Sequence, residues 1–331
     1  MTTVSQWFTR IAPAAAVMLV AAGAASAAEP AAAFPSKTMT IVVPYPAGGA
    51  TDMLARMIAQ RFTATWHQPA IVENKAGANG WIGNGAVARA APDGYTILLT
   101  ISTIVYAPHL YAKLPYDVNK DLIPVSMLSR TPNVLLVPSS VPANTLEEFV
   151  ALVRKNPKKY NFGSYGIGST SHVAGETLNR QAGIDLLHVA YKGAAPLVND
   201  LLGGTVTAGV VDAGTIRPHA KAGKVKALAV TGTQRVNYLP DVPTFAERGY
   251  KGMDLVGYFL VMAPAGTPKD IVKKLSDTIA ATLRMPENTA RIEDLGMSVV
   301  AGTPEQLGIA MKADSEVFGA AVKTANITID N

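Results

Sequence analysis

The residues of this chain that could do chemistry begin with a turn that is almost bare of side chains. The stretch YPAGGATD, from Tyr45 to Asp52, lies between a predicted strand and a predicted helix, and we call it the glycine turn. Gly48 and Gly49 allow positive φ angles and let a ligand approach the backbone closely. The helix start offers unpaired N–H groups and a partial positive charge, and Thr51 or Asp52 can cap it. These features predict a site for a carboxylate or another anion. The alternative is a tight turn that needs glycine only for its conformation.

A second segment near the middle of the chain repeats this design. Residues 163–172, GSYGIGSTSH, are called the serine loop and place the hydroxyls of Ser164, Ser169 and Thr170 ahead of a predicted helix. Hydroxyls and free N–H groups at a helix start can again hold an anion. Two such segments, one in each half of the chain, fit a dicarboxylate or a carboxylate with a polar far end. The alternative is a flexible loop with a serine or threonine N-cap.

Nucleophilic catalysis has weak support. A nucleophile elbow around Ser164 would need a glycine two residues earlier, and that position holds Phe162. Four histidines could in principle pair with a serine, but they stand in no recognisable triad order: His109, His172, His188 and His219.

Metal and cofactor sites also have little support. The five histidines lie far apart in the sequence and form no H-x-x-x-H or H-E-x-x-H pair, so no metal site is expected. The glycines of residues 75–90 do not form G-x-G-x-x-G, so no dinucleotide cofactor is expected. Asp212 ends a predicted strand, where it can accept hydrogen bonds from a ligand amine or hydroxyl. The alternative for Asp212 is a loop cap.

Short apolar strands and amphipathic helices alternate along the chain. Residues 95–100, YTILLT, are apolar on both faces, which is typical of a central strand in a parallel sheet. Thr145 is a suitable helix N-cap, because Glu147 and Glu148 stand in the first turn that follows it. Strand–helix–strand alternation implies right-handed crossovers, so the predicted fold class is α/β with doubly wound sheets.

This alternation predicts two doubly wound α/β lobes joined by a hinge that the chain crosses twice. Lobe 1 is expected to hold residues 34–136 and 256–331, and lobe 2 residues 137–255. Ligands of open α/β sheets bind at the carboxyl ends of the strands, and ligand clefts are common between domains. We therefore expect a cleft between the lobes, in which the glycine turn and the serine loop face each other.

The composition excludes several classes of protein. Hydrophobic residues make up 49% of the 331 residues and charged residues 16%, which favours a folded core over disorder. A net charge of +5 without a run of Lys or Arg does not indicate a nucleic-acid partner. The chain has no cysteine, so it can form neither a disulfide nor a lipid anchor on an N-terminal cysteine.

The first 28 residues have the features of an export signal. Arg10 precedes an alanine-rich apolar run over residues 11–28, which ends in small residues. This pattern predicts a cleaved signal peptide over residues 1–28, and an uncleaved membrane anchor is the alternative. Cleavage would leave a periplasmic protein with a net charge of about +4, because Arg10 is the only charged side chain removed.

Six segments together resemble one known family, the Bug-type extracytoplasmic receptors of tripartite tricarboxylate transporters. They span the mature chain in order and read VPYPAGGATDMLAR, ENKAGANGWIGNGAVARAAPDGYTIL, FGSYGIGSTSHVAGE, VAYKGAAPLVNDLLGG, IRPHAKAGKVKALAVTG and DVPTFAERG. The resemblance implies a type II periplasmic binding protein fold, with two lobes that close on a ligand. It implies no reaction and no cofactor. The ligands would be small organic acids such as di- and tricarboxylates, aromatic carboxylates or acidic amino acids, and the partners the membrane subunits of a transporter. We expect a monomer.

The same resemblance assigns ligand-binding residues by position. In this family the turn after the first strand holds a carboxylate through its backbone, and later loops line the cleft. The matching positions are Tyr45, Ala47, Gly48, Gly49, Ala50 and Thr51 in the glycine turn, Ser102 and Thr103 after the third strand, Ser164, Ser169, Thr170 and His172 in the serine loop, and Asp212. One departure is that the family often has Asn after that Asp, whereas Ala213 and Gly214 follow here. The departure removes polar surface from lobe 2 and weakens the case for an amino-acid ligand.

Two other functions stay open on the residues alone. An exported hydrolase or isomerase could use Ser164 or Asp212, and turnover that is lost in S164A would favour it. A receptor that reports to a signalling partner, instead of feeding a transporter, would have the same sequence features.

Overall fold

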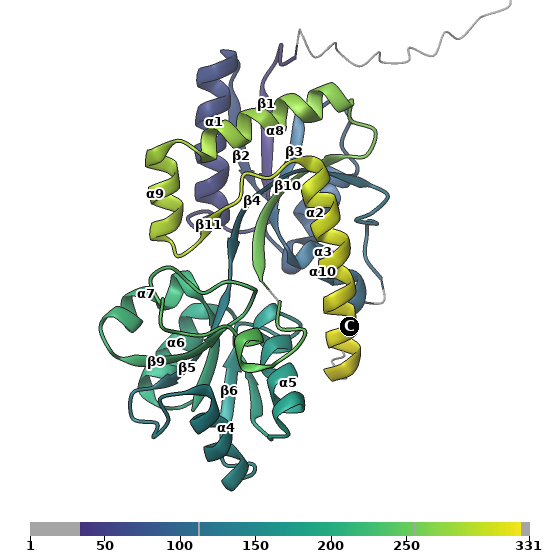
Figure 1. Ribbon diagram of the computed structural model, residues 1–331. Coiled ribbons are helices and arrows are strands. Elements are labelled where there is room, and N and C mark those ends of the chain that lie inside the picture. The colour runs from purple at the N-terminus through teal and green to yellow at the C-terminus, as the bar shows by residue number, and fades with distance from the viewer. Residues whose placement is uncertain (1–33, 112, 255, 326–331) are drawn as a thin grey trace, which may run out of the picture.

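The computed structural model describes residues 34–111, 113–254 and 256–325. The predicted signal peptide, residues 1–28, lies outside the described residues. In the described part of the chain, no helix is both long enough and apolar enough to cross a membrane. Two β-sheets, each packed against helices, form an upper lobe 1 and a lower lobe 2 (Figure 1). The predicted α/β class is confirmed.

Lobe 1 is built on a six-stranded sheet with the order β11-β4-β10-β3-β1-β2. β1 is parallel to β2 and β3, whereas β10 runs antiparallel to β3 and β4. The strands are β1 (Met39–Val43), β2 (Ala70–Asn74), β3 (Thr96–Ile101), β4 (Leu122–Thr131), β10 (Gly257–Pro264) and β11 (Ser298–Val299). The helices are α1 (Ala50–Trp66), η1 (Ala78–Gly80), α2 (Trp81–Ala88), α3 (Thr103–Leu110), α8 (Lys269–Leu283), α9 (Pro286–Asp294) and α10 (Pro304–Ala325).

Lobe 2 is built on a five-stranded sheet with the order β7-β6-β8-β5-β9. β6 is parallel to β7 and β8, and β5 runs antiparallel to β8 and β9. The strands are β5 (Asn133–Pro138), β6 (Asn161–Ser164), β7 (Leu187–Ala190), β8 (Ala208–Asp212) and β9 (Val225–Val230). The helices are α4 (Leu146–Lys155), α5 (Thr170–Ala182), α6 (Ala194–Gly203), α7 (Ala213–Lys221) and η2 (Ala246–Arg248).

Successive residues of the inner strands serve different cores. In β3, Ile97 and Leu99 belong to the core beneath α1 and α8, whereas Leu98 belongs to the core beneath α2, α3 and α10. Side chains of a strand alternate between the faces of its sheet, so a strand that is apolar throughout must be covered on both faces. β5 does the same in lobe 2, with Val134 and Leu135 in separate cores. The strand predicted at residues 95–100 is thus confirmed as central and covered on both faces, but its sheet is mixed and not parallel, because β10 runs antiparallel to β3.

The passage between the lobes lies earlier in the chain than the sequence predicts. β4 ends at Thr131 in the sheet of lobe 1, and β5 begins at Asn133 in the sheet of lobe 2, so Pro132 alone connects them. The predicted boundary at residues 136–137 is wrong because β5 pairs with β8 and β9 along its whole length. The chain returns to lobe 1 between residue 254 and β10.

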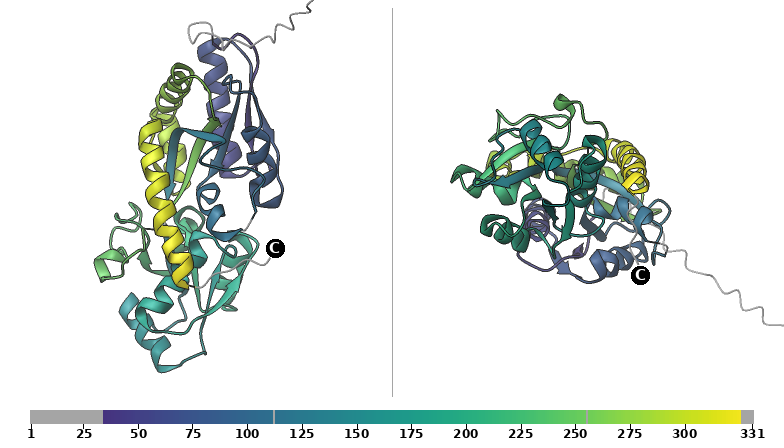
Figure 2. Two further views of the ribbon diagram at one scale, coloured as in Figure 1. Left: turned by 90° about the vertical axis from the view of Figure 1, so that its right-hand side faces the viewer. Right: turned by 90° about the horizontal axis from the view of Figure 1, so that it is seen from below.

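The C-terminal helix belongs to both lobes by contact. α10 packs on α3 and β4 of lobe 1 and also on α5 of lobe 2. Figures 1 and 2 show it as one long rod that descends from the upper lobe along the side of the lower one. The sequence-based assignment of residues 256–331 to lobe 1 alone therefore needs this addition.

This topology turns the carboxyl ends of the parallel strands toward one another. β4 and β5 continue into each other through Pro132, and each has parallel strands of its own sheet ending on the Pro132 side. The loops that follow β1 and β3 in lobe 1 therefore face those that follow β6 and β8 in lobe 2. The predicted site residues all lie on these facing edges.

Candidate functional site

The glycine turn is held by its own carboxylate. Gly48 has φ +90°, and its N–H donates to Oδ2 of Asp52 over 3.0 Å. Asp52 in turn forms a bidentate pair with Arg56, with Nε–Oδ2 2.9 Å and Nη2–Oδ1 3.0 Å. The pair with Arg56 is the main cause of the lowered pKa of Asp52. Asp52 therefore holds the turn through the N–H of Gly48, but neither Thr51 nor Asp52 caps the start of α1, whose N-cap Gly49 has no side-chain cap hydrogen bond.

The N–H groups that follow Gly48 are the ones left for a ligand. Within the described part of the chain, the backbone N–H groups of Gly49, Ala50 and Thr51 have no hydrogen-bond acceptor. The turn lines a cavity of about 470 Å³, whose opposite wall includes Arg291 and Leu295. Ala47 is exposed in the turn, whereas the side chain of Thr51 is buried in α1. The first turn of α1 can therefore donate several hydrogen bonds to an anion.

The structure brings together the residues predicted after β1 and after β3. The hydroxyl of Tyr45 lies 3.3 Å from Oγ1 of Thr103. Ser102 is buried, and its N–H donates to the carbonyl of Tyr258 over 2.9 Å. Ser102 therefore joins β3 to β10, and Tyr45 and Thr103 supply the hydroxyls at this edge. Burial raises the pKa of Tyr45, so its hydroxyl stays protonated.

Two hydroxyls of the serine loop shape the loop itself. Ser164 is completely buried, and its Oγ lies 2.8 Å from Nε2 of His188. Ser169 is the N-cap of α5, since its Oγ accepts the N–H of His172 over 3.2 Å and donates to the carbonyl of Gly166 over 2.6 Å. The N-cap that the sequence offered as an alternative for this loop is present in the structure.

Sequence reasoning missed a polar network behind the serine loop. Thr170 Oγ1 lies 3.0 Å from Nδ2 of Asn133 and 2.6 Å from the hydroxyl of Tyr165. The same Asn133 receives the Tyr165 hydroxyl on Oδ1 over 3.1 Å, and its N–H donates to Thr231. Asn133 and Thr231 stand at the ends of strands that face the other lobe. A polar residue directly after Pro132 was the only signal of this network in the sequence.

Two histidines that lie apart in the sequence are stacked in the structure. The ring centroids of His172 and His188 are 3.7 Å apart, and the ring planes meet at 12°. Burial lowers the pKa of each to about 4. Their separation in the sequence did not indicate this contact, which arises because the parallel pairing of β6 with β7 sets His188 opposite Phe162.

The histidine pair does not have the geometry of a metal site. The ligand atoms of His172, Glu176 and His188 lie within 4.8 Å of one another. However, Nδ1 of His172 accepts the N–H of Gly168 over 3.1 Å, so the neutral ring carries its proton on Nε2, the atom that faces Glu176. Nearly parallel stacked rings also cannot direct two in-plane lone pairs at one ion. His172 supports the serine loop from behind.

Asp212 is occupied within its own helix. One carboxylate oxygen accepts the N–H of Thr215 over 2.9 Å, and the other accepts the Thr215 hydroxyl over 2.8 Å. Asp212 is thus the N-cap of α7. Between the two roles that the sequence left open for this residue, the geometry favours the cap.

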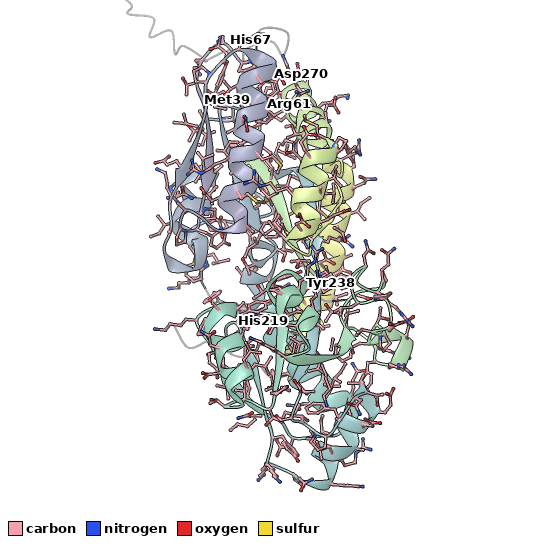
Figure 3. The ribbon with its side chains drawn as sticks, turned by 90° about the vertical axis from the view of Figure 1, so that its left-hand side faces the viewer. Met39, Arg61, His67, His219, Tyr238 and Asp270 are labelled. Carbon is pink, nitrogen blue, oxygen red and sulfur yellow. The ribbon has the colours of Figure 1, made fainter. Side chains whose placement is uncertain are left out.

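The lobes also touch each other beside this edge. Nη1 of Arg217 in α7 donates to the carbonyl of Glu293 in α9 over 2.9 Å. A second cavity of about 460 Å³ lies here between the lobes, and its walls include Arg217, Tyr238 and Gly296. Figure 3 shows Tyr238 at the end of lobe 2 that meets lobe 1.

Comparison with known proteins gives one consistent result. The family described as "Tripartite tricarboxylate transporter family receptor" matches residues 54–327. Protein BugT of Bordetella pertussis is 35% identical over 275 residues, covering 82% of this chain and 84% of BugT. The solved structure of the periplasmic binding protein BugD is 37% identical, with a TM-score of 0.75, and the match covers 89% of this chain and all of BugD (100%).

Two further solved structures contain ligands. R. palustris Rpa4515 with adipate is 33% identical, with a TM-score of 0.78 and coverage of 89% of this chain and 100% of that one. MatC (Rpa3494) from Rhodopseudomonas palustris with bound malate is 33% identical, with a TM-score of 0.73 and coverage of 87% and 100%.

Proposed function

Because this chain belongs to the receptor family of the tripartite tricarboxylate transporters, we propose that it binds a small organic carboxylate between its lobes in the periplasm and delivers it to a transporter of that type. The protein is a solute-binding protein and not an enzyme. In this proposal it acts as a monomer, and its partner is the membrane part of the transporter.

The observation that carries the carboxylate assignment is the free start of α1. Gly49, Ala50 and Thr51 present consecutive N–H groups without an acceptor in the described chain, and Gly49 and Ala50 line a cavity. A helix start of this kind favours negative charge by the helix dipole and by direct donation. Hydrogen bonds to a charged group contribute about 1.5–3 kcal/mol each. Two or three such bonds from the start of α1 are therefore enough to bind a ligand carboxylate.

Hydroxyl side chains stand at the facing edges of both lobes. Tyr45 and Thr103 stand on lobe 1, and Ser169 and Thr170 begin α5 on lobe 2. The Ser169 and Thr170 hydroxyls are engaged inside lobe 2, so in this proposal the hydroxyls of Tyr45 and Thr103 and the backbone start of α5 hold the second polar end of a ligand when the lobes close. The adipate and malate in the related structures are both dicarboxylates, which supports a diacid with two polar ends as the ligand class here.

A thermal-shift screen of the purified protein without residues 1–28 tests this proposal. The panel holds mono-, di- and tricarboxylates, aromatic diacids and acidic amino acids, with the matching amides and esters as controls. A ligand at 100 times its Kd stabilises the folded state by about 2.7 kcal/mol, which moves Tm by several degrees. Stabilisation by one class of acid, with its amides inactive, is the expected result. If no acid stabilises the protein and mass spectrometry finds none bound to it, the carboxylate assignment is wrong.

A further inference from the structure

Two glycines on opposite lobes bring their backbones into direct contact. Gly214 lies in α7 of lobe 2, and a Cβ atom placed on it would stand 1.9 Å from the carbonyl oxygen of Leu295 in lobe 1. A Cβ on Gly296 of lobe 1 would stand 2.4 Å from Cα and 2.6 Å from N of Gly214. Neither position can carry a side chain while the lobes keep this arrangement.

The requirement for glycine at position 214 comes from the other lobe. Gly214 has an ordinary helical setting, without the positive φ that favours glycine at Gly296. Inside lobe 2, the nearest atom to its Cβ would be Oδ1 of Asp212 at 3.4 Å, an ordinary contact. Alanine is favoured over glycine in a helix by about 1 kcal/mol. Lobe 2 on its own would therefore accept alanine here, and only the contact with Leu295 excludes it.

Side chains around the two glycines hold the lobes together at this point. Arg217, one turn along α7, donates to the carbonyl of Glu293 over 2.9 Å and lies 3.4 Å from Asp294. Its guanidinium stands 5.5 Å from the ring centroid of Tyr238, whose hydroxyl donates to the carbonyl of Ala213. The direct contact between the Gly214 and Leu295–Gly296 backbones is thus flanked by polar interactions of Arg217 and Tyr238.

The loop that makes this contact borders both cavities of the site region. Leu295 lines the cavity of the glycine turn, and its neighbour Gly296 lines the cavity between the lobes. The walls of the glycine-turn cavity all belong to lobe 1, whereas the cavity between the lobes has Arg217 and Tyr238 of lobe 2 as well as Gly296 of lobe 1. A change in the distance between Gly214 and this loop therefore changes the width of the cavity between the lobes.

We propose that the contact between Gly214 and the Leu295–Gly296 loop is the stop that limits lobe closure, and that it sets the length of ligand that the closed cleft accepts. The ligand part of this inference rests on the proposed function. A methyl group at position 214 must move from 1.9 Å to beyond 3.4 Å from the carbonyl of Leu295, so the backbones part by about 1.5 Å. That distance is about one carbon–carbon bond of a ligand chain.

The first test measures the Kd of unbranched α,ω-dicarboxylates with three to eight carbons by calorimetry. G214A should bind the diacid that wild type prefers at least tenfold more weakly, and its optimum should move to a longer chain by about one carbon. G203A is the matched control, because Gly203 ends α6 of the same lobe, is exposed, and would meet only Oγ1 of Thr205 at 3.9 Å. A folded G214A protein with the length profile of wild type would overturn the proposal.

The second test measures lobe separation without relying on affinity. The chain has no cysteine, so T65C in α1 and K155C in α4, both exposed, can carry a pair of spin labels without interference. With G214A the distance distribution should move to longer values, in the free protein or with the tightest diacid. Identical distributions in both states would overturn the stop. If wild type binds no carboxylate of the thermal-shift panel, the proposed function is wrong, and this distance measurement in the free protein still tests the stop.

Discussion

The rings of His172 and His188 lie 3.7 Å apart and nearly parallel behind the serine loop, with His172 buried and His188 partly buried. His172 receives the N–H of Gly168, and His188 stands within hydrogen-bond distance of Ser164. Two adjacent cations in this position would repel each other and would lack water, so both rings are neutral in the folded protein. The shape of the serine loop therefore depends on the protonation state of this histidine pair.

This pair predicts a loss of stability in acid. The pKa of each ring is about 4 in the folded protein and about 6.5 in an unfolded chain, so the unfolded state binds more protons between these values. Stability from the pair is complete above pH 6.5 and is lost as the pH falls toward 4. Urea unfolding from pH 7.5 to 4.5 should give a falling free energy of unfolding in wild type and a shallower slope in H188Q. H67N, at the distant C-terminus of α1, should keep the wild-type slope; equal slopes in all three proteins would contradict the prediction.

The glycine turn predicts a large effect of G48D on binding. A Cβ at Gly48 meets no atom within 4 Å, so the new carboxylate has room but places a negative charge beside the free N–H groups of α1. We expect the Kd for the bound acid to rise at least tenfold by calorimetry. G183D is the control, because Gly183 also has a positive φ and open surroundings but ends α5. Unchanged affinity in G48D would show that the ligand carboxylate does not bind at this turn.

Asp52 and Arg56 predict opposite effects on binding and similar effects on stability. Both D52N and R56Q break the bidentate pair, so each should lower Tm by a few degrees. D52N removes a negative charge next to the anion site and should tighten carboxylate binding severalfold, whereas R56Q removes a positive charge and should weaken it. Calorimetry at low ionic strength measures both. A change of the same sign in the two variants would show that charge near the turn does not act on the ligand.

The capping role of Asp212 predicts that it does not select for an amino group. D212A should cost about 1 kcal/mol of stability, the usual loss for an N-cap. The ratio of the Kd values for aspartate and succinate should stay at its wild-type value, because both Asp212 oxygens are engaged by Thr215. If D212A instead weakens the binding of aspartate relative to succinate, the Asp212 carboxylate contacts the ammonium group of the ligand.

Features that depend on neighbouring residues were predictable from the sequence. The N-cap at Thr145 is confirmed, with the N–H of Glu148 donating to its hydroxyl over 3.1 Å, and so is the strand at residues 95–100 with apolar residues on both faces. The features that escaped prediction are set by pairing between distant segments. Strand pairing places β5 in lobe 2 and stacks His188 on His172, and no local pattern encodes either result.

Helix α10 alters the mechanics of the joint between the lobes. If the two chain crossings were the only connections, lobe 2 could rotate relative to lobe 1 about the axis that passes through them. α10 is fixed to α3 by the stacked rings of Tyr106 and Phe318, 4.1 Å apart, and by His109 and Ser315, and it meets α5 of lobe 2 to one side of the crossings (Figure 1). The contact between α10 and α5 lies away from this axis and therefore restricts the rotation. A movement of lobe 2 relative to lobe 1 would then require α5 to shift along the surface of α10.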